Sequence, residues 1–116
     1  MSRPKPPTKI DIEMLKADLI VARDAAKAAI TGQQDGGTSC FDHPVLLVPK
    51  DKKTLAAIEA AGFRPSDGYG FWKGFVSLYG APGSNYQGQL RTTGAETVAK
   101  VLSDRGWTAN VHYAMD

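Results

Sequence analysis

The chain is poor in several features that mark particular protein classes. It has one cysteine, Cys40, so an internal disulfide is excluded, and a reducing intracellular setting is the simplest interpretation. No apolar run approaches the length needed to cross a bilayer, and the beginning, MSRPKPPTK, lacks the apolar core of a secretion signal. We therefore expect a cytoplasmic protein that does not enter a membrane.

The chain also lacks strong charge and familiar enzyme signatures. A formal net charge of +2 is too small to indicate a nucleic-acid or anionic-membrane partner by itself. No Walker loop, G-x-S-x-G, H-E-x-x-H or dinucleotide fingerprint occurs. Two histidines and one cysteine do not reach a zinc-ligand spacing. These absences favour a binding protein over an enzyme, with no catalytic residue, metal or cofactor expected.

The length of 116 residues suits one compact domain. Prolines and basic side chains dominate residues 1–8, which cannot bury anything, so we expect a disordered basic tail there. Residues 9–116 are expected to form a single α+β domain.

A long helix is predicted over residues 11–31, with Thr8 and Asp11 resembling a capping box and Gly32 ending it. Apolar residues recur at steps of three and four: Ile12, Leu15, Leu19, Ala22, Ala26 and Ala29. This stripe is broad for a helix on one small sheet. Either it packs closely within its own domain, or it buries a second surface against another copy of the chain.

Alternating strand and helix signals follow. Residues 38–49 read as a strand with its buried part at 45–48, and Asp51 caps a helix at 52–61. A very short strand at 63–64 and the turn RPSDGYG lead to the strand FWKGFVSLY. A third helix at 94–105, with a capping box from Thr93 and Glu96, precedes a last strand at 107–115.

This order predicts a ferredoxin-like βαββαβ arrangement after the long N-terminal helix. In that fold an antiparallel sheet carries its helices on one face. The extra first helix would then either cover the other face of the sheet or build an oligomer.

One face of FWKGFVSLY is the first candidate site. Strand alternation places Phe71, Lys73, Phe75, Ser77 and Tyr79 together. Aromatic rings beside a lysine form a stacking platform for a base, which contributes about 1–3 kcal/mol per stacked base. The competing interpretation is that the first helix or a second subunit covers these rings as core.

The connection GSNYQGQLRTTGAE is the second candidate site, because it holds many hydrogen-bonding groups and few apolar ones. Its glycines let a backbone approach a ligand, and Arg91 precedes the expected helix start, where unpaired N–H groups favour an anion. A solvated arginine is the alternative. The polar side chains expected to contact a ligand are Asn85, Gln87, Gln89, Arg91 and Thr92.

The stretch CFDH places a thiol near an imidazole, the pair used in nucleophilic catalysis. On a strand, however, Cys40 and His43 point to opposite faces. Catalysis is therefore not expected here, and His112 reads as a surface or supporting residue.

The segment DGYGFWK resembles the third-strand motif of RNA-recognition domains. Gly68, Tyr69, Gly70 and Phe71 match that motif, whereas Asp67 stands where a basic residue is expected. The resemblance implies single-stranded RNA binding, which the acidic replacement opposes by repelling phosphate.

The chain also resembles the phage anti-Thoeris sponge family, which sequesters bacterial immune signals. The resemblance rests on size, DGGTSCFD, the aromatic hairpin before a glycine- and glutamine-rich loop with arginine, and the ending VHYAMD. It implies a homo-oligomer in the host cytoplasm that binds a cyclic ADP-ribose-type or cyclic oligonucleotide-type molecule intact and antagonises antiviral defence.

Carried over residue by residue, the resemblance assigns ring stacking to Phe71 or Phe75, a hydrogen bond to Asn85, and phosphate contacts to Arg91 or Arg105. We expect oligomerisation through the N-terminal helix. An inhibitor that blocks a host protein complex is a third possibility, and no residue pattern separates it from the sponge.

Overall fold

The computed structural model describes residues 5–37, 40–86 and 88–114. The elements, in chain order, are α1 (Ile12–Ile30), β1 (His43–Leu46), α2 (Lys52–Ala60), β2 (Arg64–Asp67), the short 3-10 helix η1 (Gly70–Trp72), β3 (Val76–Tyr79), α3 (Gln89–Asp104) and β4 (Ala109–His112). The predicted α+β class is confirmed. The division into a tail of residues 1–8 and one domain stays a prediction, and residues 1–4 lie outside the described residues.

The four strands form one antiparallel sheet in the order β2-β3-β1-β4. Its register places Val45 opposite Ser77 on one side and opposite Asn110 on the other. Pro65, in β2, is tolerated because this strand lies at the sheet edge, where a missing N–H need not break a ladder.

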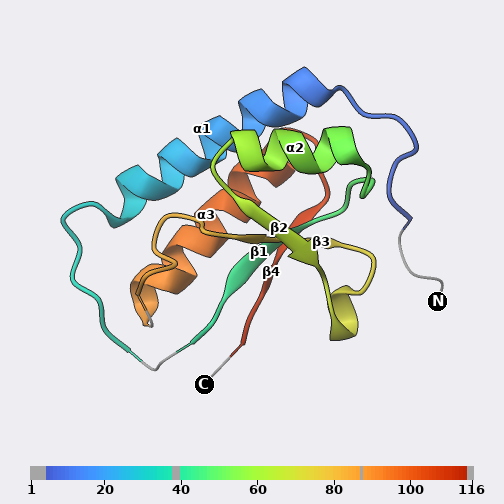
Figure 1. Ribbon diagram of the computed structural model, residues 1–116. Helices are drawn as coiled ribbons and strands as arrows, with labels where there is room; N and C mark the ends of the chain where they lie inside the picture. The colour runs from blue at the N-terminus through green and yellow to red at the C-terminus, as the bar shows by residue number, and fades with distance from the viewer. Residues whose placement is uncertain (1–4, 38–39, 87, 115–116) are drawn as a thin grey trace.

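All three α-helices lie on one side of the sheet, and α1 runs across α2 and α3 as an outer layer (Figure 1). The main core lies between these layers and includes Leu15, Leu19, Leu46 and Leu78, none of which is exposed. The first helix therefore does not cover the opposite sheet face, which was one of its two expected positions. Met14, Ile20 and Val21 remain exposed on α1, and oligomerisation through this helix stays a prediction.

Two helices form as the sequence predicts, apart from one cap. The carboxylate of Asp11 itself caps α1 by accepting the N–H of Met14 at 3.0 Å, so Thr8 is not the cap. Asp51 caps α2 by accepting the N–H of Thr54 at 2.8 Å. Gly62 follows α2 with a φ of 99°, the left-handed conformation that glycine adopts without strain.

The start of α3 was predicted wrongly, because the helix begins at Gln89 and not at Gly94. Two groups from a distant part of the sequence accept the N–H groups of its first turn. Gly36 accepts the N–H of Gln89 at 2.6 Å, and the Asp35 carboxylate accepts the N–H of Leu90 at 3.1 Å. Local capping signals at Thr93 could not reveal partners that lie more than fifty residues away in sequence.

The strand predicted over FWKGFVSLY is shorter, since β3 starts only at Val76. Gly70 and Gly74 have φ values of 60° and 100°, which break the extended backbone around η1. Trp72 consequently packs against Val45, Leu47 and Phe75, on the sheet face opposite the helices. Strict alternation along FWKGFVSLY would instead place Trp72 with Val76 and Leu78, on the face that packs against the helices.

The remaining strands also differ in length from their predictions. β2 extends through Asp67, in a segment expected to be a turn, because it pairs with β3 over four residues. β1 and β4 pair over only four residues each and are shorter than expected.

Candidate functional site

The glycines of GSNYQGQLRTTGAE are approached by the protein's own backbone. A Cβ at Gly94 would lie 1.9 Å from the carbonyl oxygen of Pro82, and one at Gly88 would lie 2.3 Å from that of Gly36. These glycines let the β3–α3 loop and residues 35–37 press against α3. Their presence is explained by packing, without a ligand.

Arg91 lies in the first turn of α3 and holds two segments together. Its Nε donates to the carbonyl oxygen of Asp42, and its Nη1 donates to that of Ser84, each at 2.9 Å. The guanidinium also lies over the ring of Phe41, 5.6 Å from its centroid. The side chain thus positions the β3–α3 loop against the segment before β1.

The hollow beside Arg91, which His43 and Tyr79 also line, has a volume of about 10 Å³. A volume of that size holds about one water molecule. It cannot accept a phosphate group as it stands.

Thr92 is also engaged within the protein, since its hydroxyl donates to the Asp42 carboxylate at 2.7 Å. The other oxygen of that carboxylate accepts the N–H of Ala114 at 2.9 Å. Gln89, at the start of α3, donates to Thr93 Oγ1 at 3.5 Å. Gln87 lies outside the described residues.

The predicted platform residues are separated. Phe71, in η1, is 84% exposed, whereas Phe75 is 5% exposed beneath Trp72. Lys73 is exposed and directly follows η1. Strand alternation holds for Phe75, Ser77 and Tyr79, but Phe71 and Lys73 precede β3.

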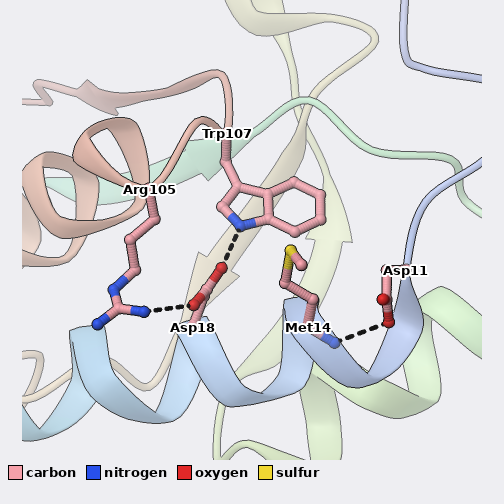
Figure 2. A network of polar contacts seen from close by, with 5 residues as sticks. All are labelled: Asp11, Met14, Asp18, Arg105 and Trp107. Carbon is pink, nitrogen blue, oxygen red and sulfur yellow. Dashed lines mark hydrogen bonds and ion pairs between the residues drawn. The ribbon is translucent and has the colours of Figure 1, made fainter.

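Arg105 forms an ion pair with Asp18, with Nη1 and Oδ1 2.8 Å apart. Figure 2 shows that the Asp18 carboxylate, on α1, meets both Arg105 and the indole N–H of Trp107 after α3. Asp18 is 5% exposed, so this network fixes α1 against the end of α3. Arg105 and Arg91 are each committed to different internal partners.

Asn85 lies in a larger hollow, here called the loop groove, between the C-terminal half of α1 and the β3–α3 loop. Its volume is about 380 Å³. The lining residues are Arg23, Lys27, Ile30, Thr31, Gly80, Pro82, Gly83, Asn85 and Tyr86.

The loop groove combines cations, a ring and an amide. Arg23 and Lys27 stand one helical turn apart on α1, and none of the lining residues is acidic. Tyr86 is 38% exposed, and Asn85 is exposed beside it. In the sequence, Arg23 and Lys27 fall outside the apolar stripe of the first helix. No local pattern shows that they face a loop sixty residues away.

A second group of ring-bearing and charged side chains lies across the helix-free face of the sheet. Arg64 is opposite Tyr79, and His43 is opposite His112. The rings of His43 and Tyr79 are 4.6 Å apart, so these four residues form one row across all four strands, here called the ring row. The ring of Tyr69 lies 4.7 Å from that of His112.

His43 is the buried member of the ring row, at 3% exposure. Its Nδ1 is 3.2 Å from the Phe41 carbonyl oxygen, which can only accept, so the neutral ring carries its proton there. Its Nε2 then accepts from the Ser77 hydroxyl at 3.2 Å. Burial lowers the pKa of His43 below its usual 6.5, and the neighbouring His112 and Arg91 lower it further.

Cys40 does not pair with this imidazole. Its sulfur lies 3.6 Å from the carbonyl oxygen of Gly88 and 3.4 Å from Thr92 Oγ1. Within the described residues, no three His, Cys, Asp or Glu side chains gather closely enough to hold a metal ion.

The residues that resemble an RNA-recognition motif, 68–71, lie in the loop and η1, before β3 begins. They are therefore not displayed on a central strand, as that motif requires.

The chain matches no protein-family model, and comparison with curated proteins and with solved structures gave no match. Any function of the loop groove or the ring row is therefore inferred from the side chains that form it. In the part of the chain that the structure describes, no helix has the length and apolar character to traverse a bilayer.

Proposed function

We propose that this protein binds a small nucleotide-derived signalling molecule, of the cyclic ADP-ribose or cyclic oligonucleotide type, and holds it unchanged in the loop groove. One observation carries the proposal: Arg23 and Lys27 share a hollow of about 380 Å³ with the ring of Tyr86 and the amide of Asn85. Pockets for small ligands occupy about 300–1,000 Å³, so the size is suitable.

The charges of the loop groove favour an anionic ligand. Arg23 and Lys27 are like charges at a spacing of four residues, which costs a helix a few tenths of a kcal/mol. No acidic residue lines the groove to offset that repulsion. The two phosphates of such a ligand, each with one negative charge, would together offset the charges of both side chains.

The other two side chains suit the rest of a nucleotide. A base stacked on Tyr86 would gain about 1–3 kcal/mol. The amide of Asn85 offers both a donor and an acceptor to ring edges or sugar hydroxyls. Arg91 acts behind the groove, because its bond to the Ser84 carbonyl holds the loop that carries Asn85 and Tyr86.

This proposal agrees with the resemblance to anti-Thoeris sponges, and we extend it to the same biological role. The protein would be a non-enzymatic phage factor that withdraws an immune signal in the host cytoplasm, as a homo-oligomer. The sheet order β2-β3-β1-β4, with α2 and α3 as crossovers, supports a ferredoxin-like arrangement within that role.

Calorimetric titration with cyclic ADP-ribose isomers and cyclic dinucleotides tests the proposal. We expect at least one of these molecules to bind, and to be recovered chemically intact after the complex is heated. Tyr86→Ala should weaken binding by about 5- to 150-fold, because it removes one stack. Lys27→Ala should weaken it as well.

The matched control is Lys16→Ala, which removes the same charge from α1 about two turns before Arg23, the nearest groove residue on that helix. It should leave affinity unchanged. Folded protein that binds none of these molecules would reject the proposal. Equal losses from Lys16→Ala and Lys27→Ala would reject the loop groove as the site.

A further inference from the structure

The helix-free face of the sheet carries a second surface that the loop groove does not include. The ring row, Arg64–Tyr79–His43–His112, crosses all four strands, with Tyr69 above its His112 end. From this arrangement we infer that the ring row and Tyr69 bind single-stranded nucleic acid.

The dimensions of the row suit successive bases. Strands in a sheet are about 4.7–4.9 Å apart, so the row spans about 14 Å from β2 to β4. Tyr79 and His112 flank the buried His43, with ring centroids 4.6 and 4.8 Å from it. Tyr69 is 54% exposed, so its ring remains accessible. Comparable sheets stack two or three bases on such rings.

The charge of this face complements a polynucleotide backbone. Arg64 ends the row and is exposed. The nearby carboxylates are turned away: Asp42 is buried against Thr92 and the Ala114 N–H, and Asp67 lies opposite the helix-facing Val76. Among the residues of this face that the structure describes, phosphates therefore meet a cation and polar rings, with no carboxylate directed toward them.

The β2–β3 connection limits where a strand of nucleic acid can lie. Trp72 covers Val45, Leu47 and Phe75, which closes the part of the face away from the ring row. A row of rings that is bordered on one side by this covered part suits an extended strand better than a small enclosed ligand.

Fluorescence anisotropy with a labelled oligouridine and the matching oligothymidine, at about 50 mM salt, tests the inference. We expect binding of at least one strand, and Tyr69→Ala should weaken it by about 5- to 150-fold. Arg64→Ala should lower the slope of log affinity against log salt by about 0.7 for the lost phosphate contact. Tyr113→Ala is the control, because Tyr113 is similarly exposed but bonded to Glu96 of α3.

Tyr86→Ala separates the two sites, since it should leave oligonucleotide binding intact while weakening the small ligand. Absence of binding by folded protein at this salt concentration would overturn the inference. Equal losses from Tyr69→Ala and Tyr113→Ala, or a loss from Tyr86→Ala as large as that from Tyr69→Ala, would also overturn it.

Discussion

Replacing Gly94 by alanine sets two physical effects against each other. Helix propensity alone favours alanine over glycine in a helix interior by about 1 kcal/mol. The structure opposes this gain, because the new Cβ would lie 1.9 Å from the Pro82 carbonyl oxygen and 3.7 Å from Gly83 Cα. The obstacle is backbone, so it cannot move aside as a flexible side chain would.

The balance predicts destabilisation. Overpacking of this kind costs about 1–3 kcal/mol and exceeds the propensity gain when a whole loop must shift. After the propensity gain of about 1 kcal/mol is subtracted, we expect the free energy of unfolding to fall by up to about 2 kcal/mol, and the urea midpoint to fall by up to about 1 M. Ligand binding should weaken too, because Pro82 and Gly83 line the loop groove.

Urea unfolding followed by circular dichroism measures the effect. Gly36→Ala is the control, since nothing lies within 4 Å of a Cβ at that position. It should leave the midpoint nearly unchanged. If Gly94→Ala raises the midpoint instead, the close packing of the β3–α3 loop on α3 is refuted.

Two further predictions concern buried polar groups. Asp18→Ala should lower the free energy of unfolding by about 2 kcal/mol in urea titrations, because Trp107 loses a buried acceptor while half-exposed Arg105 can turn to water. Lys100→Ala breaks an exposed ion pair with Asp104 and should change the free energy of unfolding by less than about 0.5 kcal/mol. Similar losses from Asp18→Ala and Lys100→Ala would contradict the role of Asp18 as a buried acceptor. The pKa of His43 in the folded protein lies below 6.5, its usual value in an unfolded chain. At a pH between these two pKa values, the unfolded state therefore binds more protons than the folded state. Stability should therefore fall as pH drops from about 7 through 6.5 towards the folded pKa, and His43→Gln should remove that slope, whereas a flat profile in the parent protein would count against the buried neutral ring.

The sequence was sufficient to predict the elements with strong local signals. The stripe Leu15, Leu19, Ala22 and Ala26 predicted α1 to within one residue at each end, and Asp51 marked the start of α2. Strand alternation correctly placed Val76 and Leu78 on the face opposite to that of Phe75. In each case the deciding interactions lie within a few residues along the chain.

The site was harder to predict because it depends on contacts between distant segments. Arg91 lies near a helix start, as an anion-binding residue would, but its guanidinium donates hydrogen bonds to the backbone carbonyls of Asp42 and Ser84. Arg105 donates instead to Asp18, which lies 87 residues away in sequence. Arg23 and Lys27 reach the loop groove only because α1 crosses the sheet's helix layer, a placement that periodicity cannot supply.

Ligand binding in the loop groove is tested by mapping backbone amide shifts by NMR while a binding nucleotide from the calorimetric panel is added. We expect the largest changes on residues 23–31 and 80–86, on the two sides of the loop groove. Changes concentrated instead on Arg64, Tyr79 and His112, or spread without a centre, would contradict the assignment of the ligand to that groove.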